Sequence, residues 1–195
     1  MLARALVRDG HDVVVLTRND VTRASQTPPW RVVRWDARTV QPEWLQELDG
    51  ADVVINLAGR SVNCRYNDAT RREIMDSRVT STRAVATAIT RCSNPPPVWL
   101  QASTATIYAH RFDAPNDDIK GIIGGSEPGV PPHWRFSTDV AKAWAAAALE
   151  TPLDATRIVL LRSAMIMSPD SGGIFWTLQM LARLGLSGAA AGGKQ

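Results

Sequence analysis

The chain has 195 residues, of which 45% are hydrophobic and 21% charged, and its formal net charge is +3. These values are those of one ordinary globular domain, and the scattered charge disfavours a nucleic-acid binder, which needs a concentrated basic face. No stretch approaches the ~20 apolar residues of a membrane span. Two cysteines without CxxC spacing and three scattered histidines indicate reduced thiols and no metal site. We therefore expect a cytoplasmic protein without nucleic-acid or membrane partners.

Apolar strand patterns alternate with helical patterns along the chain. Strands are predicted at 12–17, 31–35, 52–57, 98–103 and 157–162, and helices at 2–8, 42–48, 68–91, 138–150 and 174–184. Gly10 ends the first helix, Pro42 suits a first helical position, and Asn67 caps the long helix. The run 53–55 is apolar on both faces, which is typical of a parallel sheet covered by helices on each side. The sequence thus predicts one domain of the α/β class with a doubly wound parallel sheet.

The chain enters this pattern at a helix. A nucleotide-binding βα fold opens with a strand and a glycine-rich turn, and only then comes this helix. In the usual strand order 3-2-1-4-5-6 that first strand lies at the centre of the sheet, so the predicted strands at 12–17 and 52–57 would lack a shared neighbour. We therefore expect a partial domain, 1–195, that lacks the first strand and the glycine-rich turn.

Two segments interrupt the alternation. Residues 109–135 form a long polar connection, and connections of this length commonly carry function or are disordered. Trp134 in this connection is a candidate for covering a substrate. The tail from 188 to 195 is built of small residues. The tryptophans that fall within predicted strands or helices are expected to serve packing, namely Trp35, Trp44, Trp99, Trp144 and Trp176.

Polar and small residues gather where two neighbouring strands end. Leu57, Ala58 and Gly59 follow one strand, and Ser103 and Thr104 end the next. Lys142 lies on the helix after the long connection. Because ligands of open α/β sheets bind at the carboxyl ends of the strands, these residues form a candidate site. A hydroxyl there can donate to a substrate oxygen, and a lysine can bind ribose hydroxyls or lower the pKa of a neighbouring acid.

The strand ends, the residues after them and the helix that carries Lys142 follow one another in the order of a known family. With them the chain resembles the short-chain dehydrogenase/reductase superfamily, and in particular its atypical, sugar-nucleotide-epimerase-like branch, the NAD-dependent epimerase/dehydratase family. The matching segments run through nearly the whole chain: 10–13 with Thr17 and Arg18, 35–36, 51–59, 103–108, 136–144, 161–162 and 169–173. The resemblance implies a Rossmann-like fold, a nicotinamide cofactor and a small-molecule substrate of the sugar-nucleotide kind. It also implies a C-terminal substrate domain, which we expect to be absent from residues 1–195.

Carried over position by position, the resemblance implies a role for each matching residue. Thr17 and Arg18 would meet the 2′-phosphate of NADP, and NADP is favoured over NAD because no acidic residue occurs before Asp20. For Arg18 an exposed surface arginine is the alternative, and for Asp36, which would face the adenine, a turn former. The remaining implied contacts are Leu57, Ala58 and Gly59 along the adenosine and diphosphate, Lys142 on the nicotinamide ribose, Ser163 and Ala164 near the nicotinamide, and Ser103, Thr104 and Lys142 as catalytic residues.

The sequence departs from the superfamily at one catalytic position. The usual acid is a tyrosine four residues before the lysine, so that both share a helix face, and here that residue is Thr138. Neither Tyr66 nor Tyr108 has this spacing. Asp139 or Glu127 are alternative proton donors, although a helix-start charge and a loop residue are the simpler interpretations.

Three interpretations follow. One is an NADP-linked epimerase or oxidoreductase, a second is a non-catalytic dinucleotide-binding or regulatory module, and a third is an incomplete chain, inactive as given and unable to hold NADP tightly. We favour the third for this polypeptide and the first for the longer protein from which it would derive.

Overall fold

The computed structural model describes residues 2–19, 27–111, 113–168 and 173–188. The sequence features noted at Asp20, at 169–172 and in the tail at 189–195 lie outside these residues. The described chain divides into two units, one of residues 2–162 and one that begins at Ser163. The candidate site belongs to the first unit except for Ser163 and Ala164.

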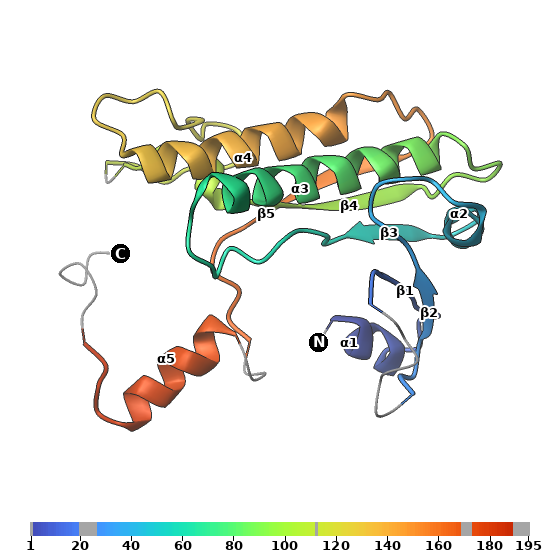
Figure 1. The fold of residues 1–195 in the computed structure, drawn as a ribbon, viewed down its shortest axis with the longest axis horizontal. Helices are drawn as coiled ribbons and strands as arrows, with labels where there is room; N and C mark the ends of the chain where they lie inside the picture. Colours follow the sequence, from blue (N-terminus) through green and yellow to red (C-terminus); the bar gives the residue numbers. More distant parts are fainter. Residues whose placement is uncertain (1, 20–26, 112, 169–172, 189–195) are drawn as a thin grey trace. The chain divides into compact units, whose positions relative to one another are not determined.

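Helices and strands alternate as the sequence predicts (Figure 1). In chain order they are α1 (Leu2–Arg8), β1 (Val14–Thr17), β2 (Arg31–Arg34), α2 (Pro42–Leu48), β3 (Val53–Asn56), α3 (Asp68–Ile89), β4 (Val98–Thr104), the 3-10 helix η2 (Ala105–Ile107), α4 (Pro132–Leu149), β5 (Arg157–Ser163) and α5 (Ile174–Arg183). Each predicted strand and helix is confirmed, with shifted ends.

The start of α4 is the largest error in these predictions. The helix begins at Pro132, not at Thr138, with Pro131 at its N-cap. Two consecutive prolines suggest a loop in the sequence. A proline at the first helical position loses no hydrogen bond, however, and its fixed φ already suits the helix. The long polar connection is shorter than predicted for this reason.

The five strands form two parallel sheets. One has the order β1-β2 and the other the order β3-β4-β5. Val14 lies opposite Arg31 in the first sheet, and Val53 lies opposite Val98 in the second. Among the described strands β1 and β3 do not pair with each other, which is where the strand order predicted a break. Val53 keeps 45% of its surface exposed although its strand is apolar, because β3 has a partner on one side only. The fold is the predicted Rossmann-like α/β class, divided into two sheets.

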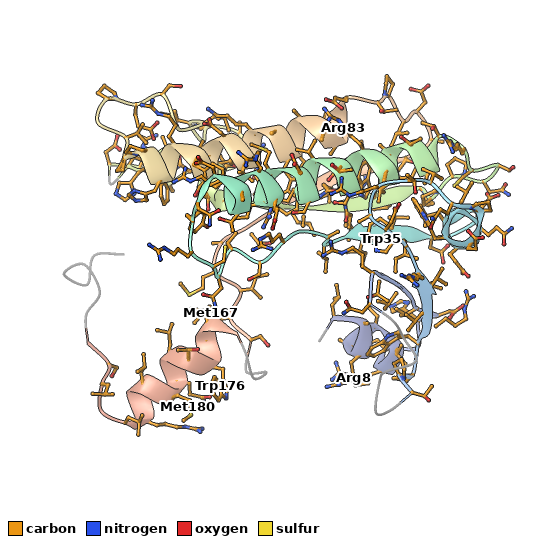
Figure 2. The ribbon with its side chains drawn as sticks, in the orientation of Figure 1. Arg8, Trp35, Arg83, Met167, Trp176 and Met180 are labelled. Atoms are coloured by element: carbon orange, nitrogen blue, oxygen red, sulfur yellow. The ribbon has the colours of Figure 1, made fainter. Side chains whose placement is uncertain are left out.

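Helices α3 and α4 lie side by side over the sheet that contains β4 (Figure 1). Both helices carry buried small residues, including Ser81 and Ala84 on α3 and Ala141 and Ala148 on α4. Small side chains allow two helices to approach closely. Arg83 of α3 pairs with Glu150 at the end of α4 at 2.6 Å (Figure 2). Among the described helices none is both long enough and apolar enough to cross a membrane.

The core of the first unit is built around tryptophans. Trp44 and Trp99 are fully buried, and Trp35 meets Trp44 edge to face with ring centroids 5.6 Å apart. Trp144 is also buried, so four of the five predictions of tryptophan packing are confirmed. The fifth, Trp176 on α5 of the second unit, is 39% exposed, as is much of the apolar surface of that helix (Figure 2). For Trp176, packing in the core or at an edge therefore stays a prediction.

Candidate functional site

The carboxyl end of β3 is fixed by a buried polar network. Asn56 is 4% exposed and donates through Nδ2 to Oε1 of Gln101 on β4, at 2.9 Å. Its Oδ1 accepts the backbone N–H of Ala58 at 3.0 Å. Thr82 of α3 accepts a second bond from Asn56 and one from the indole N–H of Trp144. One amide side chain therefore connects the turn after β3 to β4, α3 and α4.

The turn after β3 is also fastened to α3. Ser77 Oγ accepts the backbone N–H of Arg60 at 2.9 Å, and Arg78 Nη1 donates to the carbonyl of Arg60 at 3.1 Å. A Cβ added at Gly59 would lie 3.2 Å from the guanidinium carbon of Arg78, so the missing side chain of Gly59 lets the turn lie close against Arg78. Burial lowers the pKa of Arg78. The guanidinium also lies 5.1 Å from the ring centroid of Trp144.

These contacts bear on the three residues predicted to line the adenosine and diphosphate, Leu57, Ala58 and Gly59. Ala58 is held by the side chain of Asn56 on β3 and Gly59 lies against Arg78 of α3, whereas Leu57 is 57% exposed. A backbone held this way, with small side chains, presents a flat surface to a ligand at the carboxyl edge of the sheet.

The two hydroxyls at the end of β4 differ in their surroundings. Thr104 caps η2, since its Oγ1 accepts the N–H of Thr106 and shares a hydrogen bond with the Thr106 hydroxyl at 2.9 Å. Ser103 is 7% exposed, and its Oγ is buried without a partner among the described residues. A buried hydroxyl without a partner is costly, and such groups occur where a ligand completes the bond. Of the two, Ser103 is the one whose hydroxyl remains available.

Lys142 and Thr138 share a face of α4, as their spacing predicts. A Cβ added at Gly125 in the connection before α4 would lie 3.2 Å from Thr138 Cγ2 and 3.3 Å from Lys142 Nζ. Thr138 is fully buried and donates to the carbonyl of Trp134 at 3.1 Å. The ammonium of Lys142 forms no hydrogen bond or ion pair within the described chain. It is thus a half-buried cation held near the edge of the sheet without a carboxylate partner.

Thr17, Arg18 and Asp36 lie near the ends of β1 and β2. The hydroxyl of Thr17 accepts the N–H of Asn19 at 3.1 Å, and Arg18 between them is exposed. Asp36 Oδ1 accepts the N–H groups of Arg38 and Thr39, and Oδ2 accepts the Thr39 hydroxyl at 2.6 Å. The Thr39 hydroxyl and these N–H groups lower the pKa of Asp36. Asp36 therefore forms a turn, which leaves open whether it also faces an adenine.

The remaining predicted positions lie beyond Arg162. Ser163 ends β5 and Ala164 follows it, and both are exposed. They belong to the second unit, so their place near the nicotinamide stays a prediction.

Of the two alternative proton donors, Glu127 belongs to the connection before α4. Its Oε2 accepts the N–H of Gly125, and backbone N–H groups lower its pKa, which keeps it ionised near neutral pH. Asp139 is exposed. Within the described ranges no cluster of three His, Cys, Asp or Glu side chains is placed to hold a metal ion.

Comparison with known proteins identifies the chain. Residues 1–158 match the model of the NAD dependent epimerase/dehydratase family. The chain belongs to this family. It is 29% identical over 173 residues to "Epimerase family protein SSP1921" of Staphylococcus saprophyticus, which covers 89% of this chain and 53% of that protein. It is also 28% identical to the human epimerase family protein SDR39U1, over 91% of this chain and 56% of that one.

Solved structures agree. The crystal structure of human SDR39U1 (isoform 2) with NADPH matches all of this chain and 59% of its own length, with a TM-score of 0.75 and 28% identity. MoeE5 in complex with UDP-glucose and NAD matches 83% of this chain and 48% of its own, with a TM-score of 0.60, but at 19% identity it supports the fold only. The chain spans little more than half the length of these relatives.

Sequence reasoning missed the supports of the site. Asn56 lies within the matching segment 51–59, but the sequence patterns do not single it out, nor do they single out Ser77, Arg78, Thr82 and Gln101. Their positions within apolar or charged helical and strand patterns carry no signal of a contact that spans the chain. The sequence offers one hint of this network. Asn56 and Gln101 are amide residues at the fourth position of two neighbouring strands.

Proposed function

We propose that the chain is the dinucleotide-binding part of an NADP-dependent epimerase or oxidoreductase that acts on a sugar nucleotide or a related small molecule. The observation that carries this proposal is the pair of polar groups at the carboxyl edge, the buried Ser103 hydroxyl and the Lys142 ammonium, which lack partners in the described part of the chain. The NADPH complex of the human relative supports the choice of cofactor.

The residues of the chain fit most of such a cofactor. Arg18 would bind the 2′-phosphate, the turn from Leu57 to Gly59 would line the adenosine and diphosphate, and Lys142 would hold the nicotinamide ribose. Ser103, beside Thr104, would donate to a substrate oxygen. A bound nicotinamide supplies hydride transfer, and the protein positions the reacting groups. Ser163 and Ala164 would complete the nicotinamide end.

We also propose that the 195-residue polypeptide holds the dinucleotide weakly and turns over no substrate. Two features support this: the strands form two sheets, and the sequence contains no Gly-x-x-Gly-x-x-Gly turn, the element whose N–H groups bind the diphosphate in such folds.

A non-catalytic dinucleotide-binding or regulatory module is the second candidate. It is favoured by Thr138, which is fully buried, bonds to a backbone carbonyl and occupies the position of the usual tyrosine. An aliphatic hydroxyl does not replace a phenol as an acid near pH 7. Binding of NADPH without consumption of NADPH in the presence of sugar nucleotides would support this candidate over the enzyme.

The test is a fluorescence titration of the chain with NADPH and with NADH. We expect weak binding that favours NADPH, and Arg18→Glu to lower that preference about tenfold, because charge-assisted hydrogen bonds contribute ~1.5–3 kcal/mol and each ~1.4 kcal/mol is tenfold. Arg91→Glu makes the same charge change at the far end of α3 and should leave the preference unchanged. An unchanged preference in Arg18→Glu removes Arg18 from the site, and equal binding of both nucleotides contradicts the choice of NADP.

A further inference from the structure

A second site lies on the same unit, between η2, the connection after it and the end of β5. It is a cavity of about 330 Å³ whose lining includes Ala105, Tyr108, Asp118, Trp134 and Arg162. That volume is near the lower end of the range for small-molecule sites. Ala105 directly follows Thr104, so the cavity opens next to the candidate catalytic hydroxyls.

The walls of the cavity are held firmly. The segment 121–124 folds back on Tyr108 through an antiparallel bridge between Tyr108 and Ile123. A Cβ at Gly121 would overlap the Tyr108 ring, so only glycine fits there. Asn116 donates to the carbonyl of Ala109 at 3.0 Å and accepts the N–H of Ile122. The cavity is therefore a built feature of the long connection.

Arg162 lines this cavity, and part of its guanidinium group has no partner among the described residues. Its Nη1 donates to the Tyr108 hydroxyl at 2.6 Å, and its guanidinium carbon lies 5.2 Å from the Tyr108 ring centroid. Its Nε is buried without a partner, and neither Nε nor Nη2 bonds to any residue that the structure describes. Two adjacent N–H groups of arginine match the two oxygens of a carboxylate.

A second donor in the lining is also unused. The indole Nε1 of Trp134 is buried without a partner in the described chain. Arg111, the other arginine of the lining, already forms a bidentate pair with Asp113 at 2.6 and 2.8 Å. The one carboxylate of the lining, Asp118, is 3.4 Å from the Tyr108 hydroxyl and disfavours a ligand with two or more negative charges. The free donors therefore suit a group with a single negative charge and two acceptor oxygens.

We propose that this cavity binds a small molecule through a carboxylate, which Arg162 and the indole N–H of Trp134 receive. If this molecule is the substrate of the proposed enzyme, that substrate is a carboxylic acid. This step rests on the proposed function. Binding to the cavity does not depend on it, because the cavity has no lining residue from the proposed dinucleotide site.

The test uses the full chain without nucleotide and the probes glucuronate and glucose, which differ only in a carboxylate at one carbon. The seven tryptophans give indole N–H signals in a ¹H–¹⁵N spectrum, and the signal absent from Trp134→Phe identifies Trp134. We expect glucuronate to shift this signal to saturation and glucose to leave it unmoved. Equal effects of both sugars, or no shift with glucuronate, overturn the proposal, as does tighter binding of inorganic phosphate.

Variants then separate binding from folding. Trp134→Phe keeps the ring and removes one donor, and we expect a several-fold weaker affinity for glucuronate; Trp30→Phe is the matched control and should bind normally. Arg162→Lys keeps the charge without the fork and should bind about tenfold more weakly. Asp118→Asn should bind more tightly. If Arg162→Lys does not fold by circular dichroism, the other two variants decide, and unchanged affinity in both refutes the assignment. The NADPH titration plays no part in this outcome, so the two proposals fail separately.

Discussion

Replacing Gly125 with alanine tests how the connection before α4 holds Lys142. Gly125 has a φ of +92°. A Cβ there would contact Thr138 Cγ2 at 3.2 Å and Lys142 Nζ at 3.3 Å. Thr138 is fully buried and has no room to move. The lysine side chain is flexible, so we expect the added methyl group to displace its ammonium.

The size of the effect follows from a matched variant. Gly129 has a φ of +77°, and a Cβ there meets nothing within 4 Å. Alanine at either position costs ~1–2 kcal/mol of left-handed backbone strain. Only at Gly125 does overpacking add to this, by ~1–3 kcal/mol. The free energy of unfolding should therefore fall by about 1–3 kcal/mol more in Gly125→Ala than in Gly129→Ala.

Urea unfolding followed by circular dichroism measures this difference, and an NADPH titration of both variants measures its consequence. We expect weaker NADPH binding in Gly125→Ala than in Gly129→Ala, since the displaced ammonium no longer meets the ribose. Equal stability of the two variants would show that Thr138 and Lys142 do not pack against this loop, and equal affinity would remove Lys142 from the site.

Three further predictions concern the supports of the site. Asn56→Ala should lower the free energy of unfolding by about 2–4 kcal/mol, because the buried partners on Gln101 and Ala58 lose their hydrogen bonds. The control Asn67→Ala removes an exposed helix cap and should lower it by only ~1 kcal/mol. Equal shifts of the melting temperature in the two variants would contradict the buried network. Thr138→Tyr should destabilise the chain by ~1–3 kcal/mol or more, since the position is fully buried, and it should restore no activity. Thermal unfolding measures the stability and a turnover assay measures the activity. A variant that is both stable and active would contradict this prediction. The pKa of Asp36 lies below its ordinary 3.8 when folded, so the unfolded chain binds more protons. The stability from this group is present above the unfolded pKa and is lost as the pH falls through the folded pKa. Asp36→Asn should therefore flatten the acid limb of urea stability below the ordinary pKa of 3.8, and an unchanged limb would show that the turn does not perturb the carboxyl group.

The fold was predictable because it rests on local patterns. The apolar runs around Val54 and Trp99, the cap at Asn67 and the proline at 42 each act within a few residues, and their elements are where the sequence places them. The division into two sheets was also predictable, since it follows from the usual strand order. The start of α4 was not predictable, because a pair of prolines such as Pro131 and Pro132 is equally compatible with a loop and with the first turn of a helix.

The site was predictable only in part, for a physical reason. Residue type and position at a strand end indicate Ser103 and the turn to Gly59, because parallel strands bring their carboxyl ends to one edge. The contacts that hold these residues come from partners far along the chain, such as Arg78 against Gly59 and Thr82 with Asn56. Arg78 lies in a helix rich in charged residues, where an arginine that packs inward looks like one that is solvated.

The resemblance implies Thr104, with Ser103 beside it, at the catalytic hydroxyl position, and strand geometry distinguishes the two side chains. Successive side chains of a strand point to opposite faces, and Ser103 alternates with Gln101 and Trp99 on the buried face of β4. Thr104 Oγ1 already accepts the N–H of Thr106 as the cap of η2 and shares a hydrogen bond with the Thr106 hydroxyl, so it has partners that Ser103 lacks within the described residues. A buried hydroxyl without a partner costs ~1–3 kcal/mol. A ligand oxygen would supply the missing partner, which makes Ser103 the stronger candidate and leaves Thr104 to shape the turn beside it.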